Sequence, residues 1–586
     1  MKNFQDLWKQ RFHSILAALY VPLGHTLGID QVVAEVPPKP EMGDLAFPMF
    51  SYSKVLRLAP PLLAKQLVQA LGSFSAEAEF FALGPYVNLR YSRSGITGSV
   101  VDLVLAEGDG WGRTKALAGD RVMVEFSSPN TNKPLHIGHL RNNTLGEAMS
   151  RILKANGAEV YKVNLINDRG VHICKSMLAY QKFGEGKTPT SEGMKPDRFV
   201  GEYYVKYARW AETDPTAEAQ AQQMLLSWEA GDPEVRALWK TMNAWAIDGV
   251  AQTYVRQGIT FDRLYKESET YLLGKDVISQ GLEKGVFRRR EDGAVVIDLP
   301  WKDRAEDEAN AVKVMLRPDG TSIYITQDLG TAIHRHADWP FNQLIYVVAN
   351  EQDFHFRVLF YVLKVLGYDW SQNLFHLNYG MVKLPDGSRI KSRSGTTADA
   401  DDILDDLAEG ALEEIRSKGR EEEVGDAPKT AELIALGALH YFLLQATPSK
   451  DMIFDPKETL SFNGNTGPYL QYMGARISSM LAKAENVDEK TWDPGLLASQ
   501  DEWELVKLLS RFPEAIEDSG RSKDPSVVAA FAYELAKTYS KFYHDSPVLT
   551  ATDPRLVAGR LRLSRAVLQV LMNSFRLMNI PFLRSM

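Results

Sequence analysis

The sequence predicts an α/β protein with a doubly wound parallel sheet at its centre, for three reasons. Strand-like and helical segments alternate at Val122–Phe126, about Gly138–Asn156 and Val160–Leu165. Two further apolar segments, Ser322–Thr326 and Gln343–Val348, read as later strands of the same sheet. The last third of the chain has apolar residues at helical spacing. Strands that alternate with helices favour a parallel, Rossmann-type sheet with helices on both faces.

Length and composition allow several domains with a large core. The chain has 586 residues, of which 45% are hydrophobic, enough for roughly three or four domains. We expect an α+β domain over residues 1–115, a Rossmann-type domain over 116–425 and an all-α domain over 426–586. A mostly helical, polar insertion is expected at about 173–300 within the middle domain. The charged stretch Glu421–Asp426 is expected to be mobile.

Local patterns predict the elements of the outer parts. Helices are expected near Asp6–Leu19 and Pro60–Leu71, with a strand at Tyr86–Arg90, in the first domain. The insertion has helical patterns at Thr216–Trp228 and Pro233–Gln257. One helical stripe of the last domain is predicted to be core: Val567, Leu568, Leu571, Phe575 and Met578.

Charge and cysteine content exclude some classes of protein. The formal net charge of −8 argues against a basic surface coated by nucleic acid, although one local basic face could still bind RNA. The single cysteine, Cys174, excludes internal disulfides and zinc knuckles built from cysteine pairs. No apolar run approaches the ~18 residues of a membrane span. We expect a cytoplasmic protein with no membrane contact, no DNA partner and no zinc or other metal site.

The most informative motif follows the first predicted strand of the sheet. Residues 127–141 read SSPNTNKPLHIGHLR, with His136 and His139 on either side of Gly138. A helix N-terminus attracts anions, and a glycine lets a ligand approach the backbone closely. The turn therefore predicts a site for nucleotide phosphates. The four-residue motif alone is a moderate signal, because it also arises by chance.

The turn resembles the signature of class I aminoacyl-tRNA synthetases, and its flanks narrow the resemblance to the arginyl-tRNA synthetase family. Other segments match in the order of that family: Asn167–Gly170, Tyr324–Leu329, Glu351–Phe356, Asn465–Tyr472 and Ala475–Ile477. Gly43–Phe47 and Pro60 resemble the extra N-terminal domain of bacterial members. The resemblance thus spans most of the chain.

The resemblance implies how the phosphates of ATP are held. Amino-acid activation places charge on the α-phosphate and on departing pyrophosphate, so positioned donors are the main requirement. His136 and His139 would supply those donors, and Gly138 would let the nucleotide lie close to the backbone. Class I enzymes also carry a Lys-Met-Ser-Lys-Ser loop. Here residues 387–395 read GSRIKSRSG, with Ser392 in place of the second lysine.

The missing lysine has an explanation in the family, where a lysine just before the first motif supplies the cation. Lys133 matches that position. Three basic residues of the loop at 387–395 remain candidates for neutralising pyrophosphate: Arg389, Lys391 and Arg393. A solvated basic loop is the alternative interpretation of this cluster.

The expected amino-acid pocket suits a guanidinium, which is planar, always charged and best held by carboxylates with further acceptors around them. By resemblance, three residues surround the guanidinium: Tyr324, Asp328 and Gln352. Three others hold the amino and carboxylate end of arginine: Glu125, Ser127 and Asn130. We expect Tyr324 on a strand and Asp328 at the start of the next helix. Without the resemblance, a helix cap would be the preferred interpretation of Asp328. For Glu125, a structural ion-pair partner is the alternative interpretation.

The implied activity is arginine–tRNA ligation. ATP and L-arginine form arginyl-adenylate, and the 3′-terminal adenosine of tRNA(Arg) then takes the arginyl group. Mg²⁺ is expected with ATP, activation is expected to need bound tRNA, and a monomer is expected. In the last domain, Tyr469, Tyr472 and Arg476 interleave aromatic rings with a base, which suits contact with unpaired RNA bases.

Two other function classes stay open at this point. A small nucleotidyltransferase could use the same turn on another substrate, although its members usually lack a large helical C-terminal domain. A tRNA-binding paralogue without catalysis is the non-enzymatic alternative, and the intact His136, Gly138, His139 and Lys133 argue against it. Synthetases for cysteine, methionine or branched aliphatic amino acids fit less well, because they commonly use zinc sites or editing insertions. Those for glutamate and glutamine need cations in the pocket, whereas the pocket expected here has carboxylates.

Overall fold

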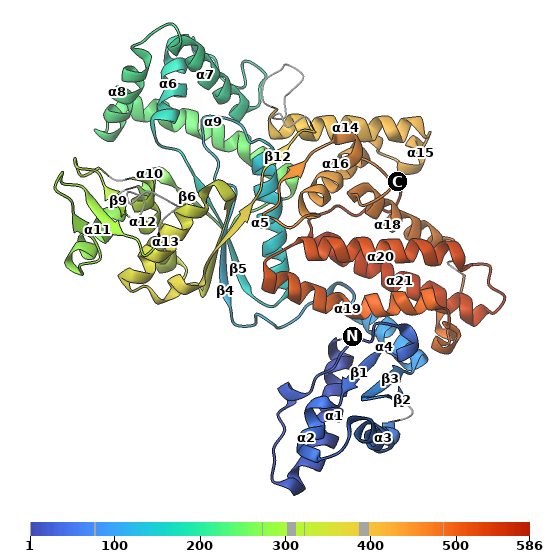
Figure 1. Cartoon of the computed structure of the whole chain (residues 1–586). Coiled ribbons are helices and arrows are strands. Elements are labelled where there is room, and N and C mark those ends of the chain that lie inside the picture. Colours follow the sequence, from blue (N-terminus) through green and yellow to red (C-terminus); the bar gives the residue numbers. More distant parts are fainter. Residues whose placement is uncertain are drawn as a thin grey trace.

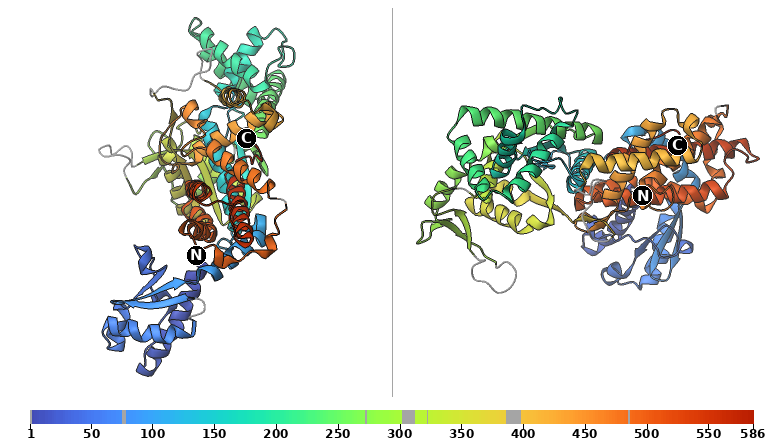
Figure 2. Two further views of the ribbon diagram at one scale, coloured as in Figure 1. Left: turned by 90° about the vertical axis from the view of Figure 1, so that its right-hand side faces the viewer. Right: turned by 90° about the horizontal axis from the view of Figure 1, so that it is seen from above.

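The computed structural model describes residues 2–74, 78–271, 273–301, 312–321, 323–385, 398–484 and 486–586. Figure 1 shows a central sheet, with a helical lobe above it, a bundle of long helices on one side and a small N-terminal domain below that bundle. Figure 2 shows the N-terminal domain projecting from the body in a second view. Among the described residues, no helix is long and apolar enough to cross a membrane.

The N-terminal domain packs helices against a three-stranded antiparallel sheet, so it is α+β as predicted. Its strands lie in the order β1 (Leu45–Pro48), β3 (Tyr86–Tyr91) and β2 (Ala78–Leu83). Its helices are α1 (Lys2–Tyr20), α2 (Phe50–Leu56), α3 (Pro60–Leu71) and α4 (Arg93–Glu107). Trp8, Phe12 and Leu16 recur every fourth residue of α1 and are buried, because they form one face of that helix.

The central sheet has five parallel strands. Their spatial order is β11 (Leu374–Tyr379), β10 (Gln343–Ala349), β4 (Arg121–Glu125), β5 (Glu159–Ile166) and β6 (Arg263–Lys266). Helices α5 (Ile137–Ala155), α12 (Tyr324–Asp338) and α13 (Asp353–Leu366) connect or cover these strands. The chain moves outward from β4 through β5 and β6, then returns to the other side of β4 at β10. This reversal makes the carboxyl edge beside β4 the expected ligand crevice.

One predicted strand is wrong. The described part of the segment predicted as a strand at 322–326 does not join the sheet, because α12 begins at Tyr324. Ile325 lies on this helix and is buried in the hydrophobic core. Thr326 Oγ1 donates to the carbonyl of Met315. A short apolar run has the same composition in a buried helix and in a buried strand, so its pattern alone does not separate the two.

The helical insertion comprises α6 (Val171–Phe183), α7 (Pro196–Ala211), α8 (Ala217–Glu229) and α9 (Pro233–Gln257). It ends earlier than expected, because β6 follows α9 and pairs with β5. The short helices α10 (Glu267–Thr270) and α11 (Gly274–Glu283) come next. An antiparallel sheet then forms from β7 (Arg288–Arg289), β8 (Val295–Asp298) and β9 (Val312–Leu316).

The C-terminal part is helical, as predicted. Its helices are α14 (Ala400–Ser417), α15 (Glu421–Val424), α16 (Ala427–Leu444), α17 (Pro456–Thr459), α18 (Gly467–Ala482), α19 (Gln500–Ser522), α20 (Ser526–Asp545) and α21 (Pro554–Leu577). The short strands β12 (Val382–Lys383) and β13 (Met452–Ile453) pair in parallel. Within the stretch Glu421–Asp426, the first four residues form α15, and the expected mobility stays a prediction. In the predicted stripe of α21, Val567, Leu571 and Phe575 are fully buried.

Candidate active site

The chain turns sharply where β4 ends. Ser127 and Ser128 have φ values of +77° and +47°, a left-handed conformation that non-glycine residues rarely adopt. Their backbone N–H groups donate to Asn142 Oδ1 at 2.6 Å and Asn164 Oδ1 at 3.0 Å. The hydroxyl of Ser127 lies 2.6 Å from that of Tyr254. Such conformations persist only where surrounding contacts enforce them, and they cluster at functional sites.

The two signature histidines cap the start of α5. His136 is the N-cap residue, and its Nδ1 accepts from the Gly138 N–H at 3.1 Å. His139 Nδ1 accepts in turn from the His136 N–H at 3.2 Å. Because each Nδ1 accepts, the proton of each neutral ring is on Nε2. The ring centroids lie 4.0 Å apart, so the two imidazoles are direct neighbours.

Charge around this turn favours anions. Burial, followed by the nearby His136 and Lys133, lowers the pKa of His139 well below its usual value. His139 is therefore neutral at pH 7 and keeps its donor and acceptor roles distinct. Lys133 is partly buried and close enough to influence His139. Lys133, the imidazoles of His136 and His139 and the positive end of the α5 dipole thus meet in one turn.

Glu125 has a structural partner that the sequence left as an alternative. Glu125 is buried, and its side chain pairs with the buried Arg335 of α12. Its other oxygen accepts from Ser128 Oγ at 3.3 Å. Asn130 is exposed and forms a parallel bridge with Asn167 at the end of β5. Ser127 is buried, and its side chain is directed to Tyr254 rather than to solvent.

The predicted guanidinium ligands gather on α12 and before α13. Tyr324, at the first position of α12, is 76% exposed. Asp328 lies one turn later on the same face, and His355 Nε2 donates to its Oδ2 at 2.6 Å. Gln352 is exposed and directly precedes α13. The expectation that Tyr324 belongs to a strand is wrong, since the two residues are neighbours on one helix.

The structure adds an acidic residue that the sequence analysis missed. The pKa of Glu267 is raised to about 7, mainly by burial; Arg169 lowers it, and the nearby carboxylates of Asp168 and Asp328 raise it. Asp168 is buried and accepts from the N–H and hydroxyl of Ser268 at 2.8 and 2.7 Å. Three carboxyl groups therefore lie within electrostatic reach of one another. Arg169 and Lys266 are the cations that partly offset these carboxylates.

A sequence signal for Glu267 did exist. The residue directly follows β6, so it lies at the carboxyl edge of the sheet like the other candidates. The prediction of one insertion over 173–300 hid this short strand. The candidates Arg389, Lys391, Ser392 and Arg393 lie outside the described residues.

A second candidate surface lies on α18 and α20. The guanidinium of Arg476 lies 4.6 Å from the ring centroid of Tyr543 and 6.0 Å from that of Tyr472. The rings of Tyr469 and Tyr533 are 5.9 Å apart. All five side chains are only partly buried. Partly exposed aromatic rings next to a guanidinium suit stacking with nucleic-acid bases.

Family models match all three parts of the chain. A model described as tRNA synthetases class I (R), catalytic domain, matches residues 100–456. The Arginyl tRNA synthetase N terminal domain matches residues 6–91, and the DALR anticodon binding domain matches residues 470–586.

Full-length relatives carry one name. The arginine–tRNA ligase of Treponema denticola is 53% identical over 100% of both chains. That of Treponema pallidum is 52% identical, again over 100% of both. The arginine–tRNA ligase of Borreliella burgdorferi is 43% identical over 96% of each chain.

Solved structures share the fold. Thermus thermophilus arginyl-tRNA synthetase has a TM-score of 0.75 at 24% identity and covers 99% of this chain and 100% of its own. The Plasmodium falciparum enzyme has a TM-score of 0.73 at 17% identity, covering 99% of both chains. The sheet, the signature turn and the matched catalytic model define a class I aminoacyl-tRNA synthetase. Within that class, the chain belongs to the arginyl-tRNA synthetase family.

Proposed function

We propose that this chain activates L-arginine with ATP and transfers the arginyl group to the 3′-terminal adenosine of tRNA(Arg). One observation supports the assignment: a cationic turn and an anionic pocket lie along the same edge of the sheet. The turn contains Lys133, His136 and His139 and suits a triphosphate. The pocket contains Asp168, Glu267 and Asp328 and suits a guanidinium.

In the first step, the carboxylate of arginine attacks the α-phosphate of ATP and pyrophosphate leaves. The Nε2 protons of His136 and His139 donate to phosphate oxygens as negative charge accumulates on them. The ammonium of Lys133 offsets charge on the leaving pyrophosphate. Gly138 keeps the turn narrow, because a Cβ at that position would lie 2.9 Å from Cε1 of His136.

The side chain of arginine is held by Asp328 and Glu267, with Tyr324 and Gln352 as further polar contacts. A guanidinium placed among these groups relieves the repulsion between carboxylates, so binding favours the ionised form of Glu267. Lysine has a point charge and no planar fork, so this pocket selects arginine. His355 orients Asp328 through their hydrogen bond.

The amino and carboxylate end of arginine lies nearer to β4 in this proposal. Asn130 is exposed at that edge, whereas Ser127 and Glu125 are already partnered by Tyr254 and Arg335. We propose direct contact with Asn130. For Ser127 and Glu125, direct contact with arginine stays a prediction from the resemblance.

Magnesium is expected to enter with the phosphates of ATP. Among the residues that the structure describes, no three His, Cys, Asp or Glu side chains are placed to hold a metal ion.

In the second step, a ribose hydroxyl of the terminal adenosine attacks the activated carbonyl, and AMP leaves. The rings and guanidinium on α18 and α20 are proposed to contact unpaired anticodon bases. The monomeric state, the cytoplasmic location and the need for tRNA during activation stay predictions.

The assignment is tested by charging total tRNA with each of the twenty labelled amino acids, and by ATP–pyrophosphate exchange with arginine, with and without tRNA. Charging with arginine alone supports the proposal. Charging with another amino acid would mean that the acidic pocket is misassigned. Folded protein that binds tRNA but charges nothing would indicate a catalytically inactive paralogue.

A further inference from the structure

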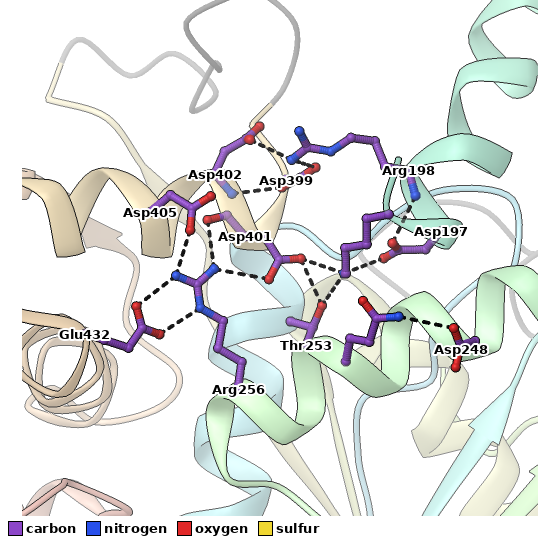
Figure 3. A network of polar contacts seen from close by, with 12 residues as sticks. Asp197, Arg198, Asp248, Thr253, Arg256, Asp399, Asp401, Asp402, Asp405 and Glu432 are labelled. Carbon is purple, nitrogen blue, oxygen red and sulfur yellow. Dashed lines mark hydrogen bonds and ion pairs between the residues drawn. The ribbon is translucent and has the colours of Figure 1, made fainter. Parts of the chain in front are cut away.

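The first turn of α14 is held by the beginning of α7. We call its three carboxylates, Asp399, Asp401 and Asp402, the α14 clasp. Arg198 Nη2 lies 2.5 Å from Asp399 Oδ2 and 2.6 Å from Asp402 Oδ1. Lys195 Nζ lies 2.6 Å from Asp401 Oδ2. Figure 3 shows the contacts of Arg198 with Asp399 and Asp402.

The α14 clasp also reaches α9 and α16. Thr253 Oγ1 donates to Asp401 Oδ2 at 3.0 Å, and Arg256 Nη1 lies 3.4 Å from Asp401 Oδ1. The same guanidinium pairs with Glu432 of α16, with donor–acceptor distances of 2.8 and 3.0 Å (Figure 3). One polar network therefore joins the insertion, α14 and the C-terminal helices.

The α14 clasp is attached directly to the signature turn. Asp399 forms an antiparallel bridge with His136. The N–H of Ala400 donates to the carbonyl of Leu135 at 2.8 Å. The backbone that presents His136 to the nucleotide is thus hydrogen-bonded to the residues that Arg198 holds. Any shift of the clasp moves this backbone with it.

The helix α7 also packs on the segment just before the signature histidines. A Cβ at Gly201 would lie 2.8 Å from Pro134 Cδ and 3.5 Å from Lys133 Cα. A Cβ at Gly249 of α9 would lie 2.3 Å from the backbone nitrogen of Asp197, so the start of α7 is seated tightly on α9. The insertion therefore contacts the turn through its packing and through the clasp.

We propose that Arg198 and Asp399 are positioning residues for the nucleotide site. Their ion pair fixes the turn that carries Lys133 and His136 relative to the sheet edge, and neither side chain contacts the reacting atoms. The inference rests on the proposed assignment of residues 133–139 to ATP.

The test compares R198A, D399N, the double variant R198A/D399N and R198K in the full-length enzyme with tRNA(Arg) present. D399N keeps an oxygen to cap α14, where Asp399 Oδ1 accepts from the Asp402 N–H at 2.9 Å, and it replaces the charged acceptor that faces Arg198 with a neutral amide. G201A probes the packing contact independently. R288A is the matched control, because Arg288 forms a similar ion pair with Asp298 on the outer antiparallel sheet. H136A is the reference for the nucleotide assignment.

ATP–pyrophosphate exchange, the KM for ATP, the KM for arginine and the thermal midpoint are measured for each variant. We expect R198A and D399N each to lower kcat about tenfold and to raise the KM for ATP, because small misplacements of reacting groups slow catalysis steeply. The KM for arginine stays unchanged in R198A and D399N. The control R288A keeps the exchange rate and both KM values of the unmodified enzyme. The double variant loses no more than either single variant, R198K recovers part of the rate, and G201A resembles R198A.

Three results would overturn the proposal. The first is an unchanged kcat in R198A and D399N, and the second is additive loss in the double variant. The third is an equal rise in both KM values with a lowered thermal midpoint, which indicates a general structural role. If H136A also leaves exchange unchanged, the nucleotide assignment itself fails. If H136A lowers exchange and the other variants do not, only the positioning role fails.

Discussion

The two sides of the crevice satisfy their polar groups in different ways. On the nucleotide side, His136, Gly138 and His139 exchange hydrogen bonds within one turn of chain. On the amino-acid side, Glu267 and Asp328 come from segments about sixty residues apart and raise each other's electrostatic energy. The nucleotide side is therefore complete before its ligand binds, whereas the amino-acid side has an excess of negative charge that a guanidinium neutralises.

This difference explains why the two sides respond differently to substitution. Removing a donor from the nucleotide side removes an interaction that strengthens as the reaction proceeds, so kcat falls. Removing a carboxylate from the amino-acid side weakens binding of the ground state and of the transition state together, so KM rises.

The largest expected effect is that of H136A. The kcat for adenylate formation should fall roughly 100- to 1,000-fold, as when one preorganised donor to a developing anion is removed. Pre-steady-state formation of arginyl-adenylate measures it. Affinity for tRNA(Arg) should stay near that of the unmodified enzyme, and H334A, at an exposed histidine of α12, is the control. Equal losses of rate and tRNA affinity would indicate misfolding instead.

The next largest effect is expected for D328N. Loss of a charge-assisted hydrogen bond of roughly 1.5–3 kcal/mol should raise the KM for arginine about ten- to hundredfold. The KM for ATP should not change. D338N, at the other end of α12, is the matched control. A change confined to the KM for ATP would contradict the pocket.

Arginine binding should depend on pH through Glu267, whose pKa is raised to about 7 by burial and by neighbouring carboxylates. Below pH 7 the carboxyl is protonated in the free enzyme, so arginine must displace a proton and its affinity falls by up to about tenfold per pH unit. E267Q should remove this dependence and bind arginine weakly at every pH. Calorimetric titration between pH 5.5 and 8.5 tests both statements.

The same shift has a consequence for the stability of the arginine-free protein. The folded chain holds the proton of Glu267 more tightly than the unfolded chain, whose value is near 4.5. Stability therefore falls as pH rises from about 4.5 to 7, and E267Q should lose this part of the pH dependence. An identical pH profile for both proteins would mean that Glu267 is not buried among charges.

The smallest effect is expected for G138A. The added Cβ would lie 2.9 Å from Cε1 of His136, so the imidazole must turn aside. We expect kcat to fall by about three- to tenfold. Stability should not fall, because alanine favours a helix more than glycine does. Unaltered kcat would show that the ring adjusts without loss.

Several elements follow from local sequence because their residues interact with near neighbours. Helices α3 and α9 have the bounds that their patterns predict. One apolar face repeats along α3, whereas α9 is bounded by the Asp232 cap and by Gly258 in a left-handed conformation. The turn at His136 is equally local. The structure of the segment at Tyr324 depends on distant residues. Ile325 packs in the core beneath α12, and Thr326 bonds to Met315 of β9, so tertiary contacts favour a helix there.

The sequence by itself determined the parallel sheet, the nucleotide turn and, through resemblance, the family. Each of these depends on residues that lie close together along the chain or on motifs kept in order. Only the tertiary structure brought Glu267 beside Asp328, paired Glu125 with Arg335 and joined Arg198 to Asp399. These contacts span from about 60 to more than 200 residues, and electrostatic interaction depends on distance in space, which the order of residues does not specify.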